Sequence, residues 1–223
     1  MEKIELKHCM DLDANDPLRE LRSEFLLAET GSIHFDANSM GAMPKTVPEK
    51  VAWMLNEGWR NLGRQGWSKL DWIDQPKKLG NGIAHLLGAQ PEDVVVCDNT
   101  SINLHKLISY AWGIKNSGNI LLTESNHFPT DVYIAEGWIK SLKNYGVDAE
   151  IRFADSHEQL LDCLDENVAV VNVSYVDYRT SLRWDMGRLM QKAQEVGALV
   201  VWDLSHAAGA VEIDLMGNDA DFA

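Results

Sequence analysis

The stretch Val168-Ala-Val-Val-Asn-Val-Ser174 and, further along the chain, Leu199-Val-Val-Trp-Asp203 decide the fold of this protein. Both runs are almost wholly apolar and rich in β-branched residues, which is typical of strands buried on both faces of a sheet. The segment between them, Met186–Val196, has apolar side chains at helical spacing. Because parallel strands need long crossover connections, which helices supply, this order of elements predicts parallel strands.

The same alternation extends toward the N-terminus as far as residue 94. Short β-rich runs alternate with amphipathic segments, most of which are followed by a glycine that favours a helix C-cap. The expected strands are Val94–Cys97, Asn119–Leu122 and Ala149–Phe153, and the expected helices are Ser101–Trp112, Thr130–Tyr145 and His157–Leu164. The sequence therefore predicts an α/β fold with a mostly parallel sheet. Asp219–Ala223 resembles the approach to another strand, so we expect the fold to be incomplete at its C-terminus.

Residues 1–32 are expected to form an N-terminal helical segment that precedes a domain over residues 33–223. A helix-start signal at Asp16-Pro17 is followed by apolar residues at helical spacing until Gly31. Beyond this segment, the expected elements are a short strand over Ile33–Asp36 and helices over 47–55 and 79–87.

The composition excludes several classes of function. Lys and Arg number 20 against 34 Asp and Glu, which gives a formal charge of -14. This charge repels nucleic acid and anionic membrane surfaces, so neither is an expected partner. The three cysteines are widely separated and form neither a disulfide framework nor a metal motif. Met1–Asp16 holds no apolar stretch long enough for a signal peptide, and we expect a cytoplasmic protein.

Polar residues that follow the expected strands are the candidates for a ligand site, because ligands bind beyond the carboxyl ends of parallel strands. Thr100 and Ser101 open a helix, where unpaired backbone N–H groups and the helix dipole favour an anion such as phosphate. An ordinary helix N-cap explains the same two residues. Phe128 could stack on a flat ring, although Pro129 and Asp131 beside it are also simply a good helix start.

Asp203 places a carboxylate at the end of a very apolar strand. A buried carboxylate needs a partner, which is either a cation of the protein or a protonated ring nitrogen or metal brought by a ligand. Asp203 and His206 are three residues apart, a spacing that allows two metal ligands, but no third ligand follows. We therefore expect no metal site, and His206 alone is more often a structural histidine than an acid or base.

These residues resemble, in type and order, the class V aminotransferase branch of the fold-type I pyridoxal-phosphate enzymes, and within it the kynureninases. The resemblance runs from Ile33 to Ala223. It is carried jointly by Asp36-Ala-Asn-Ser-Met-Gly-Ala-Met-Pro44, Asp98-Asn-Thr-Ser-Ile-Asn-Leu104, Phe128-Pro-Thr-Asp131, Ser174-Tyr-Val-Asp-Tyr-Arg-Thr180 and Trp202-Asp-Leu-Ser-His-Ala-Ala-Gly-Ala210.

The resemblance implies that pyridoxal 5'-phosphate is the cofactor and that the large domain of a fold-type I enzyme is present. Asp203 would pair with the pyridine nitrogen and keep it protonated, so that the ring accepts electrons from the substrate. The other residues that the resemblance assigns to the cofactor are Thr100 and Ser101 for the phosphate, Phe128 for stacking, Pro129, Thr130 and Asp131 for the wall behind it, and Ser174 and His206 for the polar ring substituents. Ser39 and Trp67 would face the substrate.

The activity that the resemblance implies is hydrolysis of L-kynurenine, or 3-hydroxykynurenine, to L-alanine and an anthranilate, by a homodimer acting on a small amino-acid substrate. The lysine that forms the Schiff base in this family is expected beyond Ala223, so residues 1–223 alone are expected to be inactive. Two alternatives remain open. One is another class V enzyme such as a cysteine desulfurase or lyase, and the other is a non-catalytic binding protein that has lost the lysine.

Overall fold

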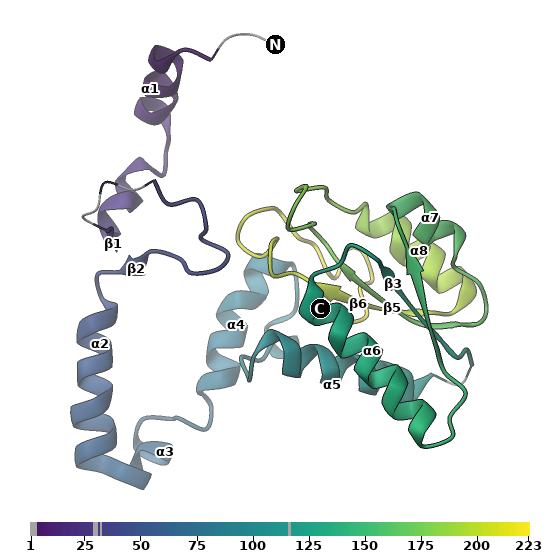
Figure 1. Ribbon diagram of the computed structural model, residues 1–223. Coiled ribbons are helices and arrows are strands. Elements are labelled where there is room, and N and C mark those ends of the chain that lie inside the picture. The colour runs from purple at the N-terminus through teal and green to yellow at the C-terminus, as the bar shows by residue number, and fades with distance from the viewer. Residues whose placement is uncertain (1–3, 29–30, 32, 116) are drawn as a thin grey trace. The chain divides into compact units, whose positions relative to one another are not determined.

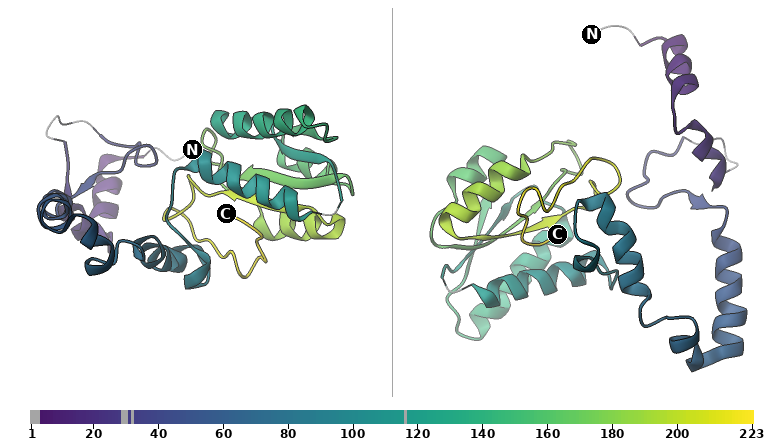
Figure 2. Two further views of the ribbon diagram at one scale, coloured as in Figure 1. Left: turned by 90° about the horizontal axis from the view of Figure 1, so that it is seen from below. Right: turned by 180° about the vertical axis from the view of Figure 1, so that it is seen from behind.

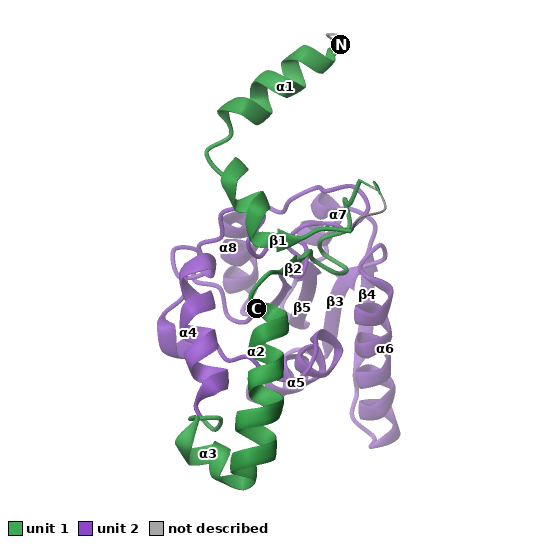
Figure 3. Cartoon of the chain, turned by 90° about the vertical axis from the view of Figure 1, so that its left-hand side faces the viewer, with its two compact units in different colours: residues 1–73 green, residues 74–223 purple. Residues whose placement is uncertain are grey.

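The computed structural model describes residues 4–28, 31, 33–115 and 117–223 (Figure 1). The chain divides into two compact units, residues 1–73 and residues 74–223, which Figure 3 colours separately. Each unit is described by itself. The expected boundary between residues 32 and 33 includes a residue outside the described ranges, so this boundary stays a prediction.

The second unit is built on a four-stranded parallel sheet. Its strands are β3 (Ile120–Glu124), β4 (Glu150–Ala154), β5 (Val168–Ser174) and β6 (Leu199–Asp203). They lie in the order β4-β3-β5-β6, and every ladder is parallel. The predicted α/β class with a parallel sheet is confirmed. Phe222 makes a further parallel bridge to the outer side of β6.

Two pairs of helices cover the two faces of this sheet. Helices α5 (Thr100–Ile114) and α6 (Pro129–Asn144) pack on one face, and α7 (His157–Asp162) and α8 (Met186–Val196) pack on the other. Figure 2 shows this sandwich from two further sides. From Val170 onward, the apolar side chains of β5 enter the two opposite clusters with the twofold period of a strand. Ala169 and Val170 share one cluster, because the register with β3 shifts at this point.

The predicted strand Val94–Cys97 is wrong. This segment is extended but joins no ladder, and it follows helix α4 (Gln75–Leu87) and the short helix η4 (Pro91–Asp93). The Val96 N–H donates to the Pro76 carbonyl oxygen at 3.1 Å. β-Branched residues favour an extended backbone, but a strand also needs a neighbouring strand, which the local pattern does not specify.

The first unit consists of short elements. They are α1 (Leu6–Asn15), the 3-10 helix η1 (Arg19–Glu24), β1 (Phe25–Leu26), β2 (Met43–Pro44), α2 (Val47–Trp53), the π-helix η2 (Met54–Leu62), the 3-10 turn η3 (Gly63–Gln65) and α3 (Gly66–Lys69). Strands β1 and β2 pair antiparallel.

Two predictions for the first unit are wrong. The helix expected after Asp16 is only the six-residue η1, because Phe25 and Leu26 leave it to pair with β2. The strand expected over Ile33–Asp36 does not form. Instead, the Met40 N–H donates to the Asp36 carbonyl oxygen at 3.1 Å, and the chain turns there. Helix α1 was not predicted, because its apolar residues are few and exposed.

Among the described residues, no helix is both long enough and apolar enough to cross a bilayer. Cys9, Cys97 and Cys163 are free thiols. In the same ranges, no group of three or more potential ligands gathers around a metal position.

Candidate functional site

The carboxyl ends of β5 and β6 bring two candidate residues together. Ser174 and Asp203 are the last residues of these strands and are partners in the parallel register. The Ser174 hydroxyl donates to Asp203 Oδ2 at 3.1 Å and also approaches the Val176 carbonyl oxygen at 3.0 Å. Both side chains are buried. Adjacent parallel strands thus fix the carboxylate of Asp203 at the edge where such sheets bind ligands.

The second oxygen of Asp203 is held by the turn that follows β6. Asp203 Oδ1 accepts the Ser205 N–H at 2.9 Å and the Ser205 hydroxyl at 2.5 Å. All three hydrogen bonds to the carboxylate therefore come from hydroxyl or backbone N–H groups of uncharged residues. These hydrogen bonds orient the carboxylate of Asp203. They also stabilise its charged form, which burial without hydrogen bonds would disfavour.

Three rings meet beyond the carboxyl ends of β3, β5 and β6, and we call Phe128, Tyr178 and His206 the aromatic wall. The ring centroids of Phe128 and Tyr178 are 5.1 Å apart in an edge-to-face contact. His206 lies 6.4 Å from Phe128 and 6.1 Å from Tyr178. Phe128 is 38 % exposed, so part of its ring is open to a ligand. Phe128 and His206 were assigned to the cofactor from the sequence, whereas Tyr178 was part of the Ser174–Thr180 stretch without a role of its own. A hairpin after β5 carries it here.

Behind the wall, His127 and Asp131 form a buried pair. His127 Nδ1 accepts the Phe128 N–H at 2.7 Å and lies 3.6 Å from Asp131 Oδ2. His127 Nε2 and Asp131 Oδ2 are buried without a hydrogen-bond partner in the structure. Unsatisfied buried polar atoms are costly, and their presence is typical of a site that receives a polar ligand or water.

Burial and neighbouring charge change the protonation of this pair. Burial, and after it the negative charge of Asp203, together raise the pKa of Asp131 to about 7, against the lowering effect of a hydrogen bond from Thr130. Burial lowers the pKa of His127 to about 4, against the opposing effect of Asp203 and Asp177. At neutral pH His127 is therefore uncharged. In the sequence, His127 follows an expected strand but carries no motif, and only its position before Phe128 and four residues before Asp131 could have indicated a role.

Thr100 and Ser101 begin α5, but they are not its cap. The cap is Asn99, whose side chain accepts the Ile102 N–H at 3.1 Å. The N–H groups of Thr100 and Ser101 lie in the first turn, where a helix provides no internal partner for them. Helix α5 packs against β5 and β6, the strands that end in Ser174 and Asp203. Among the described residues, the structure shows no side-chain contact between Thr100 or Ser101 and Asp203.

The remaining candidates are Pro129, Thr130, Ser39 and Trp67. Pro129 and Thr130 are exposed in the first turn of α6, next to the aromatic wall. Ser39 is exposed in the turn over 36–40, and Trp67 is exposed in α3, edge-on to Trp72 at 6.4 Å. Ser39 and Trp67 belong to the first unit, so their role toward a substrate stays a prediction.

Residues 33–223 match the family model described as aminotransferase class-V. The chain belongs to this family. Two solved structures share its fold. Cysteine desulfurase CsdA from Escherichia coli has a TM-score of 0.72 at 15 % identity, over 92 % of this chain and 53 % of that chain. Cysteine desulfurase from Thermococcus onnurineus has a TM-score of 0.64 at 18 % identity, over 100 % and 54 %. The predicted fold-type I class is confirmed.

Curated relatives of this chain include kynureninases. The kynureninase of Pseudomonas fluorescens is 40 % identical over 219 residues, which are 96 % of this chain and 52 % of the relative. The kynureninase of Burkholderia pseudomallei strain K96243 is 36 % identical over 221 residues, 97 % and 52 %. The chain spans about half the length of these relatives.

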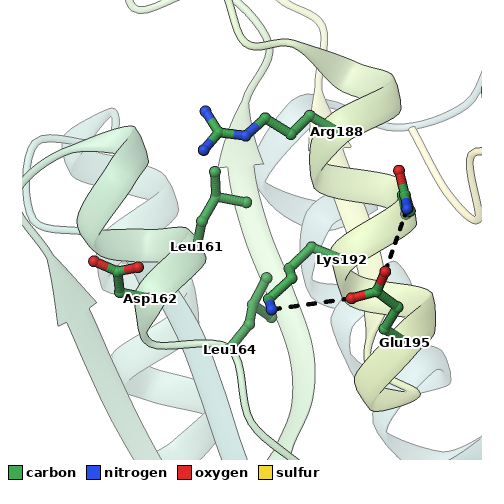
Figure 4. A pocket seen from close by; sticks show the side chains of 7 residues that line it. Leu161, Asp162, Leu164, Arg188, Lys192 and Glu195 are labelled. Carbon is green, nitrogen blue, oxygen red and sulfur yellow. Dashed lines mark hydrogen bonds and ion pairs between the residues drawn. The ribbon is translucent and has the colours of Figure 1, made fainter.

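A separate surface cavity of about 410 Å³ lies between α7 and α8 of the class V unit (Figure 4). It is lined by Leu161, Asp162, Leu164, Arg188, Gln191, Lys192 and Glu195. Its cations are already paired, since Arg188 binds both oxygens of Glu158 and Lys192 lies 3.9 Å from Glu195. None of the candidate residues lines this cavity, and it forms no part of the site around Asp203.

Proposed function

We propose that this chain supplies the part of a pyridoxal-phosphate enzyme that contains Asp203. The enzyme would hydrolyse L-kynurenine to L-alanine and anthranilate, or 3-hydroxykynurenine to L-alanine and 3-hydroxyanthranilate. The observation that carries the proposal is the buried Ser174–Asp203 pair beside the aromatic wall. Identity of 36–40 % to kynureninases over nearly the whole chain supports the choice of substrate.

The residues present fit pyridoxal phosphate by their chemistry. The cofactor has a flat ring, a ring nitrogen that can carry a proton, and an anionic phosphate. The partly exposed ring of Phe128 suits stacking, and Asp203 suits a protonated ring nitrogen. The unpartnered Asp131 Oδ2 and His127 Nε2 are further polar atoms that a bound group could satisfy. When bound, the cofactor withdraws electrons from the substrate α-carbon.

Asp203 would accept a hydrogen bond from the ring nitrogen and stabilise its positive charge. Ser174 and Ser205 donate to the two oxygens of Asp203 and so hold the carboxylate in one orientation before a ligand binds. A neutral His127 behind Phe128 adds no competing positive charge to this region. His206, the third ring of the wall, would lie toward the ring oxygen.

Thr100 and Ser101 would bind the phosphate. Because Asn99 caps α5, the hydroxyl groups of Thr100 and Ser101 are not needed to cap the helix. The positive end of the helix dipole favours an anion at this position. Pro129 and Thr130 would extend the aromatic wall on which the cofactor ring rests. The buried Asp131 closes the same helix turn, because its N–H donates to the Phe128 carbonyl oxygen at 3.0 Å.

The lysine that binds the cofactor covalently is expected beyond Ala223 and stays a prediction. We also propose that the protein acts as a homodimer in the cytoplasm. The many exposed apolar side chains of the first unit, such as Leu6 and Trp59, support association. The three free cysteines support a reducing compartment. Sedimentation analysis of the purified protein tests the dimer.

The test of the activity uses the protein expressed from its complete gene. The purified protein, loaded with pyridoxal phosphate, is expected to show a visible absorption band that borohydride removes, and to release anthranilate and alanine from kynurenine. Parallel assays with 3-hydroxykynurenine and cysteine separate the substrate classes. Alanine from cysteine with none from kynurenine would replace this proposal by a desulfurase, and a protein that never binds the cofactor would be a non-catalytic relative.

A further inference from the structure

Glu124, the last residue of β3, contacts three separate segments of the second unit. Its carboxylate accepts the Trp184 Nε1–H at 3.4 Å and lies 3.5 Å from His157 Nε2. Its backbone carbonyl oxygen accepts the His127 N–H at 3.2 Å and so begins the turn that carries Phe128. The side chain is largely buried and is not among the residues assigned above to the cofactor or the substrate.

Trp184 closes the hairpin 175–184, which carries Tyr178. The Trp184 N–H donates to the Tyr175 carbonyl oxygen at 3.0 Å, and Val176 and Arg183 form an antiparallel bridge. Trp184 is 3 % exposed, so its indole N–H needs an acceptor within the protein. Glu124 is that acceptor.

His157 completes the cluster from α7. Its imidazole stacks on the indole of Trp184 with ring centroids 3.7 Å apart and planes 21° apart. The indole is thus fixed on its face by His157 and at its edge by Glu124. The other charged groups that act on this cluster are Asp177 from the hairpin and Glu158 from α7.

The sheet itself does not hold the hairpin to the Phe128 turn. The ladder between β3 and β5 ends at Thr123 and Asn172, one residue before Glu124. Beyond that point, the Glu124–Trp184 hydrogen bond and the edge-to-face contact of Phe128 with Tyr178 join the two segments. The first is buried and directional, whereas the second lies at the exposed rim.

We propose that Glu124 is a positioning residue that clamps the hairpin 175–184 to the Phe128 turn and thereby sets Tyr178 against Phe128 in the aromatic wall. The link to cofactor binding rests on the proposed function, because the wall is where the cofactor ring would stack. The clamp itself is a property of the protein without cofactor.

The test compares Glu124→Ala with Glu124→Gln, whose amide oxygen can still accept the Trp184 N–H. Hydrogen exchange of residues 176–183 is measured without cofactor, and pyridoxal phosphate affinity is measured by titration. Loss of one buried hydrogen bond predicts roughly tenfold faster hairpin exchange and roughly tenfold weaker cofactor binding in Glu124→Ala. Glu124→Gln is expected to stay near the parent, and so is Glu150→Ala, an exposed control in β4.

A purely structural role predicts a different pattern, in which exchange rises throughout β3 to β6 and glutamine gives no rescue. Either that pattern, or hairpin exchange within twofold of the parent, overturns the proposal. Unaltered cofactor affinity despite a loosened hairpin also overturns it, because the clamp would then not act on the wall. If Glu124→Ala does not fold, Trp184→Phe removes the same hydrogen bond and keeps a ring on His157. If the parent binds no cofactor, the proposed function fails while the exchange data still decide the clamp.

Discussion

The two units of this chain differ in how far their apolar side chains are buried. In residues 74–223, Leu122, Val171 and Trp202 are fully buried among the strands and helices of one sheet. In the described part of residues 1–73, only Gly58 and Gly66 are buried, and large side chains such as Leu6 are exposed. A sheet with helices on both faces completes its own core, whereas short helices need another surface to cover their apolar faces.

The difference also separates the candidate residues. Those assigned to the cofactor lie on the self-contained second unit, where strand register and hydrogen bonds fix them before any ligand binds. Those assigned to the substrate, Ser39 and Trp67, lie on the first unit. We therefore expect substitutions in the second unit to affect chemistry or folding, and substitutions in the first unit to affect substrate binding.

The largest effect is expected for Asp203→Asn. Asparagine keeps the shape of the side chain but removes the negative charge that would hold the ring nitrogen protonated, so kcat for kynurenine should fall by several orders of magnitude while some cofactor stays bound. Steady-state assays and absorption spectra measure both quantities. Asp162→Asn, at an exposed position of α7, is the control. Activity of Asp203→Asn within a fewfold of the parent would show that the pairing is wrong.

A matched pair of substitutions tests the contrast in packing. Leu122→Ala, in the fully buried centre of β3, should lower the free energy of unfolding by about 2–5 kcal/mol because it leaves a cavity. Leu6→Ala, at a position that is 76 % exposed, should change it by less than about 0.5 kcal/mol. Denaturant titrations of both variants give the two values. Similar losses would mean that the face of α1 is covered in the protein.

The pH dependence of stability tests the burial of Asp131. Its folded pKa of about 7 lies above the ordinary value of 3.8, so the folded protein keeps a proton that the unfolded chain releases. The contribution of Asp131 to the stability of the parent therefore falls as the pH rises through this range, by up to roughly 1 kcal/mol per pH unit. Asp131→Asn does not titrate and should gain stability relative to the parent from pH 4 to pH 7. His127 titrates with the opposite sign in both proteins, so the comparison largely removes it. A constant difference across this range would contradict the burial effect.

The sequence predicts the elements of the second unit well where a segment with a β-strand pattern also has a neighbouring strand to pair with. The strands Val168–Ser174 and Leu199–Asp203 and the helix Met186–Val196 have the predicted bounds. Val94–Cys97 has the same β-branched character but no strand beside it, and pairing is a tertiary property that a local pattern does not contain. For the same reason, Tyr178 could not be assigned to the aromatic wall, because a hairpin closure brings it to Phe128.

The protonation states of His127 and Asp131 and the N-cap of α5 are further features that the sequence alone does not predict. The burial that shifts the pKa of His127 and Asp131 depends on how α6 packs, which their spacing alone does not give. At α5, the sequence left helix capping and anion binding as rival explanations of Thr100 and Ser101. The structure assigns the capping to Asn99 one residue earlier, because only its side chain reaches the Ile102 N–H.

The smallest effect on catalysis is expected in the first unit, for Trp67→Ala. A kynurenine side chain is a flat aromatic ketone, and a ring contact of the usual strength would raise its KM by roughly tenfold when lost. The cofactor spectrum should stay unaltered, because the residues assigned to the cofactor lie in the second unit. Trp59→Ala, another exposed tryptophan of the same unit, is the control and should leave KM unchanged.

Trp67 also contacts Trp72 edge-on, so its loss could act through stability instead of substrate binding. Unfolding curves of both variants separate these causes. A raised KM with unchanged stability assigns Trp67 to the substrate. If KM rises equally in both tryptophan variants, or only together with a loss of stability, then Trp67 belongs to the packing of the first unit and the aromatic ring of the substrate must be held by other residues.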